Sequence, residues 1–127
     1  MKTALPAPTP QQIHALFLNA FNRGDVETLV ALYEPGAVLA VGNGNAIGHP
    51  AIRRAYQRLL ADGARMQLET AAVLESGDGL AVLHARWTYR RGQEAVSGMS
   101  TEVVRRQPDG SWRFVIDEPK TPNTGEP

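Results

Sequence analysis

Three stretches in the first half of the chain carry apolar residues at intervals of three and four, the spacing of amphipathic helices. Thr9 followed by Pro10 favours a helix start, because a hydroxyl can cap the first turn and proline fits its first position. The predicted helices span residues 9–24, 25–36 and 48–63.

The second half alternates apolar and polar residues with a period of two, which predicts strands. Turn sequences rich in glycine separate them. The predicted strands span residues 65–75, 80–89, 95–106 and 111–118, and a short strand at 37–41 precedes the third helix. Helices followed by an antiparallel meander predict an α+β fold in which a strongly curved sheet forms a cone around the three helices. The floor of such a cone can be a pocket.

Length and composition indicate one globular domain, since the chain has 127 residues, of which 43% are hydrophobic and 20% charged. We expect a loose proline-rich leader at 1–8, the domain at 9–119 and a polar tail at 120–127. The chain has no cysteine, which excludes disulfides and thiolate chemistry and fits a cytoplasmic protein.

Charge and hydropathy argue against a nucleic-acid partner and against a membrane-spanning segment. The formal net charge is zero and the arginine pairs lie near acidic residues, so nucleic-acid binding is not expected. No apolar run is long enough to cross a membrane. His14, His49 and His84 are not at metal-ligand spacing, so neither a metal nor another cofactor is expected. We interpret His14 as a surface or satisfied core residue and His49 as part of a helix start.

Several segments together resemble a known superfamily. They are residues 19–33, which hold a Gly24-Asp25 turn between two helices, residues 48–53, and the closing run from Ser100 to Asp117. These are similar to the nuclear transport factor 2-like superfamily and, within it, to the SnoaL-like branch. The resemblance covers about residues 10–118 and implies the cone-shaped fold. It implies no single activity, because the fold hosts isomerases, dehydratases, hydrolases, cyclases and binding proteins.

The steroid isomerases of this superfamily use a tyrosine, an aspartate base and a second acid. The matching positions here are Phe17, Val41 and Glu102. Phenylalanine cannot donate a hydrogen bond and valine cannot accept a proton, so that mechanism is not expected.

The resemblance instead implies a candidate site on the inner faces of the long strands. Residues of the same parity share one face of a strand, and the resemblance turns His84, Arg86, Glu102 and Asp117 inward. Asp117 would be the acid–base group and His84 its partner, while Arg86 and Glu102 would orient the ligand and bind an oxyanion. The expected pocket residues are Phe17, Phe21, Tyr56, Met66, Leu68, Ser100 and Val115.

The opposite faces of these strands are more apolar, which leaves two interpretations open. Without the resemblance, the apolar faces would pack beneath the helices and leave the four ionisable residues in water. With the resemblance, the apolar faces point outward and form a sheet-to-sheet homodimer. The expected interface residues are Trp87, Tyr89, Met99, Val103, Trp112, Phe114 and Ile116.

These features predict a cofactor-independent enzyme of the lyase, isomerase or cyclase type. Its substrate would be a small hydrophobic oxygenated metabolite. The alternative functions are a non-catalytic dimer that binds a ligand or stabilises a partner, and a structural dimer with a filled cone.

Overall fold

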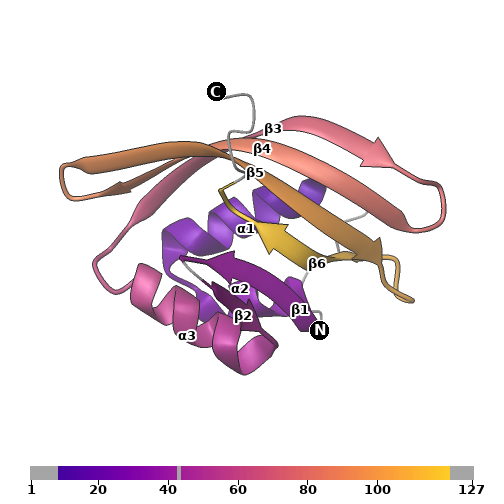
Figure 1. The fold of residues 1–127 in the computed structure, drawn as a ribbon, viewed down its shortest axis with the longest axis horizontal. Coiled ribbons are helices and arrows are strands. Elements are labelled where there is room, and N and C mark those ends of the chain that lie inside the picture. Colours follow the sequence, from indigo (N-terminus) through magenta and orange to yellow (C-terminus); the bar gives the residue numbers. More distant parts are fainter. Residues whose placement is uncertain (1–8, 43, 121–127) are drawn as a thin grey trace.

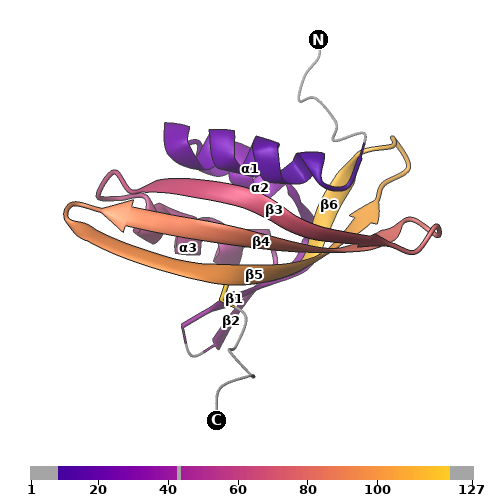
Figure 2. The same cartoon turned by 90° about the horizontal axis from the view of Figure 1, so that it is seen from above.

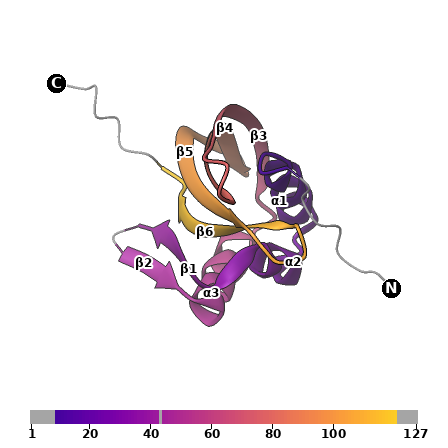
Figure 3. The ribbon, with the colours of Figure 1, turned by 90° about the vertical axis from the view of Figure 1, so that its right-hand side faces the viewer.

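A six-stranded sheet curves around three helices that pack on its concave side (Figure 1, Figure 3). This computed structural model describes residues 9–42 and 44–120. The helices are α1 (Gln12–Arg23), α2 (Val26–Ala31) and α3 (His49–Leu59). The strands are β1 (Tyr33–Val41), β2 (Gly44–Ile47), β3 (Arg65–Glu75), β4 (Leu80–Arg91), β5 (Glu94–Arg106) and β6 (Trp112–Glu118).

The strand order is β2-β1-β6-β5-β4-β3, and the long strands β3 to β5 form the predicted antiparallel meander. Only β1 and β6 pair in parallel among the described strands, so the short N-terminal hairpin extends the meander at the β6 edge. Figure 2 shows α1 running along β3. The α+β class and the curved sheet are therefore as predicted.

The helix boundaries agree with the sequence in part. Gly24 ends α1 with φ at 70°, and the Asp25 carboxylate caps α2 by accepting from the Thr28 N–H at 3.1 Å. The expected start at Thr9 was wrong, because α1 begins at Gln12. The expected end of the second helix at residues 35–36 was also wrong. The helix stops at Ala31 because the chain then pairs with β6.

The predicted leader (1–8) and the predicted tail beyond residue 120 lie outside the described residues.

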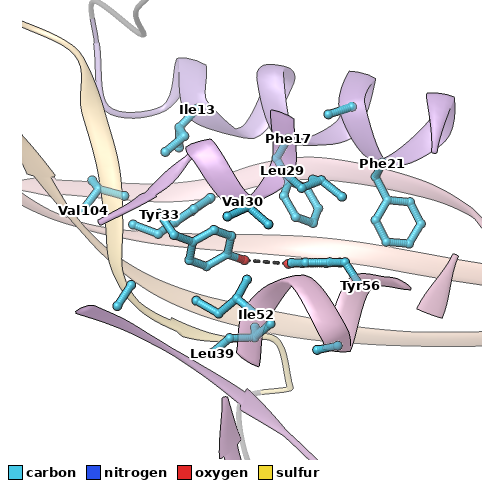
Figure 4. Close-up of a cluster of buried hydrophobic side chains, with 14 of the residues drawn as sticks. Ile13, Phe17, Phe21, Leu29, Val30, Tyr33, Leu39, Ile52, Tyr56 and Val104 are labelled. Atoms are coloured by element: carbon cyan, nitrogen blue, oxygen red, sulfur yellow. Dashed lines mark hydrogen bonds between the residues drawn. The ribbon is translucent and has the colours of Figure 1, made fainter. Parts of the chain in front are cut away.

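The core lies between the helices and the inner face of the sheet (Figure 4). Tyr33, Phe21 and Phe114 are its largest fully buried side chains. The Tyr33 ring stacks at an angle on Phe114, with centroids 4.8 Å apart. These aromatic contacts fix β1 and β6 against α1 and α3.

The turn between β4 and β5 decides which side chains of β4 face inward. It contains only Gly92 and Gln93, so Arg91 pairs with Glu94 and each pair further along joins an odd-numbered to an even-numbered residue. Directly paired residues share one face of the sheet. Glu102 faces inward and pairs with Leu83, which places Leu83 inside and its neighbour His84 outside.

The predicted inward orientation of His84 and Arg86 was therefore wrong. The inner face of β4 carries Ala81, Leu83, Ala85, Trp87 and Tyr89.

Strand β6 turns both an aromatic and an acidic side chain inward because it contains a bulge. Val103 pairs with Ile116, and the next residue, Val104, pairs with Phe114, so Val115 is the extra residue. A bulge of this kind reverses the alternation beyond it. Phe114 and Asp117 consequently both lie inside and are buried.

The predicted interface set was wrong in four of its members. The register of β6 buries Trp112 and Phe114 in the core. The tight turn between β4 and β5 directs Trp87 and Tyr89 to a cavity on the inner side of the sheet. The remaining three lie on the outer face, where Met99 and Ile116 are exposed and Val103 is half-buried.

One glycine of β5 allows Trp87 to fold over the sheet. Gly98 is the direct partner of Trp87, and a Cβ atom placed on it would lie 2.8 Å from the indole ring. The indole N–H donates to the Pro119 carbonyl, which holds the ring over this glycine.

We therefore expect Gly98→Ala to lower the free energy of unfolding by about 1–3 kcal/mol, because a packed ring must shift. Urea denaturation would measure the change. Gly36→Ala in β1 is the matched control, since a Cβ there meets nothing within 4 Å. Equal losses in the two variants would contradict this packing argument.

Candidate functional site

The helices and the inner face of the sheet line a cavity of about 240 Å³ that is partly open to solvent. Its walls are mainly apolar and aromatic side chains, contributed by α1, α3 and every strand except β2. Six of the seven predicted pocket residues line it: Phe17, Phe21, Tyr56, Met66, Leu68 and Ser100. Val115 does not, because it is the bulged residue of β6.

Two carboxylic acids lie side by side at this cavity. Glu102 of β5 and Asp117 of β6 are direct cross-strand partners, both line the cavity, and their exposed fractions are only 4% and 5%. Carboxylates so close and so dry repel each other, which disfavours ionisation of both. Each has its own hydrogen-bond partners, and these differ in kind.

Asp117 is held by two tyrosines. The Tyr33 hydroxyl donates to Asp117 Oδ2 at 2.5 Å, and the Tyr56 hydroxyl lies 2.5 Å from that of Tyr33. Because Tyr33 donates its one hydroxyl hydrogen to Asp117, Tyr56 is the donor in the hydrogen bond between the two tyrosines (Figure 4). His49 Nε2 donates to the Tyr33 carbonyl at 2.8 Å, which ties the start of β1 to α3.

Burial raises the pKa of Asp117 to about 8, the charge of Glu102 adds to that rise, and the hydrogen bond from Tyr33 partly opposes it. Burial also raises the pKa of Tyr33 and of Tyr56 well above the ordinary value, and the charge of Asp117 raises both further. At neutral pH all three groups hold their protons. Oδ2 accepts from Tyr33, so Oδ1 is the oxygen left to carry the acid proton of Asp117.

Glu102 is paired with a histidine from α1. Its Oε1 lies 2.7 Å from His14 Nε2, and His14 Nδ1 lies 2.7 Å from the Thr70 hydroxyl on β3. A carboxylate only accepts, so Nε2 donates whenever Glu102 is ionised. The two carboxyl groups thus have different surroundings, phenols around Asp117 and an imidazole beside Glu102.

Ser100 adds a hydroxyl to the cavity wall, one inward position before Glu102 on β5. Its Oγ is buried and has no hydrogen-bond partner among the residues that the structure describes. A buried hydroxyl without a partner is costly, so a ligand oxygen or a water at this wall would be stabilised.

The structure does not bring the other two predicted site residues to the cavity. His84 lies on the outer face with Nδ1 3.1 Å from the Thr101 hydroxyl, and exposed Arg86 lies 3.9 Å from Glu69. Conversely, His14 and Tyr33 belong to the site although sequence reasoning did not place them there. The interpretation of His14 as a satisfied core residue agrees with its burial and its two hydrogen bonds. His14 lies three residues before Phe17 on the apolar side of α1, and that spacing was the available signal.

Within the described part of the chain, no group of three metal-ligating side chains could hold an ion, and no helix is long and apolar enough to span a membrane.

Comparisons with known proteins place this architecture in a family. The SnoaL-like domain model matches residues 14–115, so the chain belongs to the SnoaL-like family. Its fold is that of the nuclear transport factor 2-like proteins. No curated protein matches the sequence.

Solved structures share the fold at low sequence identity. A ketosteroid isomerase-like protein from Erwinia carotovora is 20% identical with a TM-score of 0.71, over 85% of this chain and 89% of that one. An NTF-2 like protein of unknown function from Shewanella oneidensis is 19% identical with a TM-score of 0.75, over 84% and 92%. A protein from Catenulispora acidiphila, in complex with S-DNPA, is 19% identical with a TM-score of 0.67, over 84% and 86%.

The raised pKa of Asp117 predicts how stability depends on pH. An unfolded aspartate ionises near pH 4, whereas the folded pKa is about 8. Between these values the folded protein holds a proton that the unfolded chain has released, so this group's contribution to stability falls as pH rises.

We expect Asp117→Asn to remove a decline on the order of 5 kcal/mol between pH 4 and 8. Urea denaturation at several pH values would measure it. Asp62→Asn, at an exposed position, should leave the slope unchanged. Parallel slopes for the wild type and Asp117→Asn would contradict the raised pKa.

Proposed function

We propose that this protein binds a small apolar oxygenated molecule in the cavity and transforms it by acid–base chemistry, as a cofactor-independent lyase, isomerase or cyclase. One observation carries the proposal. Two buried carboxyl groups face the same apolar cavity, one kept protonated and the other paired with an imidazole.

The roles follow from these surroundings. Asp117 can donate a proton to a ligand oxygen, because its pKa of about 8 keeps it protonated at neutral pH and still lets it ionise. Glu102 can accept a proton from ligand carbon or from water, and His14 stabilises its carboxylate through the contact between Nε2 and Oε1. Because their surroundings differ, one acid can give a proton to a ligand while the other takes a proton from it, so the net charge does not change.

The tyrosines serve as positioning residues. The chain from Tyr56 through Tyr33 to Asp117 Oδ2 fixes the plane of the carboxyl group. The unpartnered Ser100 hydroxyl offers a second polar contact for the ligand. Phe17 and Val41 occupy the steroid isomerase positions and belong to the apolar wall, so the proposed chemistry does not use them.

One protein of this fold, from Catenulispora acidiphila, was solved in complex with S-DNPA, which supports the proposal that this chain binds a ligand.

Hydrogen exchange on a simple ketone tests the proposed chemistry. With 1-tetralone in D₂O, Glu102 would remove a proton from the carbon next to the carbonyl while Asp117 protonates the carbonyl oxygen, which gives the enol. Reversal with solvent-exchanged groups returns deuterium to carbon. We expect exchange roughly 10²- to 10⁴-fold above the rate without protein, falling above pH 8 as Asp117 ionises.

Mass spectrometry would measure the exchange, and saturation-transfer NMR would measure binding. Glu102→Gln and Asp117→Asn should abolish exchange, whereas Asp62→Asn at the surface should not. Binding without exchange in the wild type would refute the catalytic role and favour a non-catalytic ligand-binding protein.

The outer face of the sheet supports a homodimer, in which only Val103 and Ile116 of the proposed row belong to the interface first predicted. Leu74, Val82, Val103 and Ile116 are successive direct cross-strand partners, so they form one apolar row across β3, β4, β5 and β6. Leu74 and Ile116 are 65% and 47% exposed. The two members between them, Val82 and Val103, are half-buried. An apolar row that reaches the surface in this way favours association, and we propose that a second copy covers it.

Ile116→Glu would place a charge at the β6 end of that apolar row, and we expect it to convert the dimer to a monomer in sedimentation velocity. Gln67→Glu, on the same face but off the row, should remain dimeric. A wild-type protein that is monomeric at high micromolar concentration would exclude the dimer.

A further inference from the structure

A second hollow adjoins the cavity and has the opposite charge. Val41, Leu59, Trp87 and Pro119 line both, so the two spaces share one apolar wall. The second hollow lies where the end of α3, the end of β4 and the residues after β6 come together.

The charged side chains of this hollow are mostly cationic. They are Arg58, Arg91 and Lys120, against the single acid Glu118. Arg91 is paired with Asp62 at 3.6 Å, whereas Arg58 and Lys120 form no ion pair with any other residue that the structure describes. Arg58 lies in the last turn of α3, where the negative end of the helix dipole favours a cation. The helix dipole does not explain the position of Lys120, which follows β6.

The cavity has the reverse character. Among the described residues that line it, Glu102 and Asp117 are the acidic ones and none is lysine or arginine. An anionic group would be repelled from the acidic floor and attracted to the basic hollow. An amphipathic anion would therefore bind in one orientation only, with its apolar body inside and its charge outside.

We propose that this basic hollow binds the anionic group, such as a carboxylate, of a ligand whose apolar oxygenated body fills the cavity. The substrate class of the proposed enzyme is then an amphipathic organic acid. This inference rests on the proposed function, because it requires the cavity to hold the ligand body. It adds that the ligand is anionic and that Arg58 and Lys120 are specificity-determining residues.

Paired ligands that differ only in charge test the proposal. We would measure the affinities of 1-naphthylacetate and its methyl ester by calorimetry, and follow displacement of 1-tetralone by NMR to show that both occupy the cavity. At about 20 mM salt the acid should bind roughly two- to fivefold more tightly than the ester for each contributing cation. The preference should disappear at about 0.5 M salt, because these charges are exposed.

Variants assign the effect to the hollow. Arg58→Gln combined with Lys120→Gln should remove most of the preference for the acid and weaken the ester less. Arg54→Gln is the matched control, because Arg54 lies on the same helix, is exposed and does not line the hollow.

Equal affinity for acid and ester in the wild type would overturn this inference and leave the proposed function intact. So would an equal loss for both ligands in the double variant. Failure of both ligands and of 1-tetralone to bind would overturn the proposed function as well.

Discussion

The site depends on a direct pairing between two acidic residues of neighbouring strands. Glu102 and Asp117 occupy opposite positions of one ladder and both point beneath the helices. Burial and the neighbouring charge of Glu102 raise the pKa of Asp117, while the hydrogen bond from Tyr33 partly opposes that rise. Phenolic hydroxyls surround Asp117 and an imidazole faces Glu102. The core aromatic residues are therefore also electrostatic parts of the site, because Tyr33 packs on Phe114 and binds Asp117 at once.

This pairing exists only because β6 contains a bulge. Without the extra residue Val115, strict alternation would turn Asp117 outward whenever Phe114 points inward. The sequence supported two incompatible interpretations, an interior lined by charged groups and an interior lined by aromatic rings. Both were partly correct, since the bulge places members of both sets inside. A single-residue bulge has no reliable sequence signal, so the pattern alone could not resolve this choice.

The error on β4 has a different cause and could have been avoided. The fold class, the helices and the apolar faces of α1 and α3 follow from periodicity, which depends on local spacing. The inward face of β3 was implied only by the family resemblance. The face of a strand depends instead on register, and a tight turn fixes that register. A turn of two residues at Gly92 and Gln93 sets Leu83 opposite Glu102, which excludes His84 from the same face. His14 was missed because no local pattern shows that a carboxylate from β5 reaches a helix histidine.

Two of the positions that the resemblance matches to steroid isomerase residues lie at the cavity wall without a hydrogen-bond donor or a base. Phe17 and Val41 remain at the cavity wall, but they contribute only apolar surface. Hydroxyl donors come instead from Tyr33 at the start of β1, which donates to the Asp117 carboxyl group of β6, and from Tyr56 on α3, which donates to Tyr33. A cone directs side chains from every element toward one interior, so acid and base can move between elements without a change in topology. Family membership therefore fixes the fold, whereas the hydrogen-bond partners of the two buried acids set the chemical character of the groups that face the cavity.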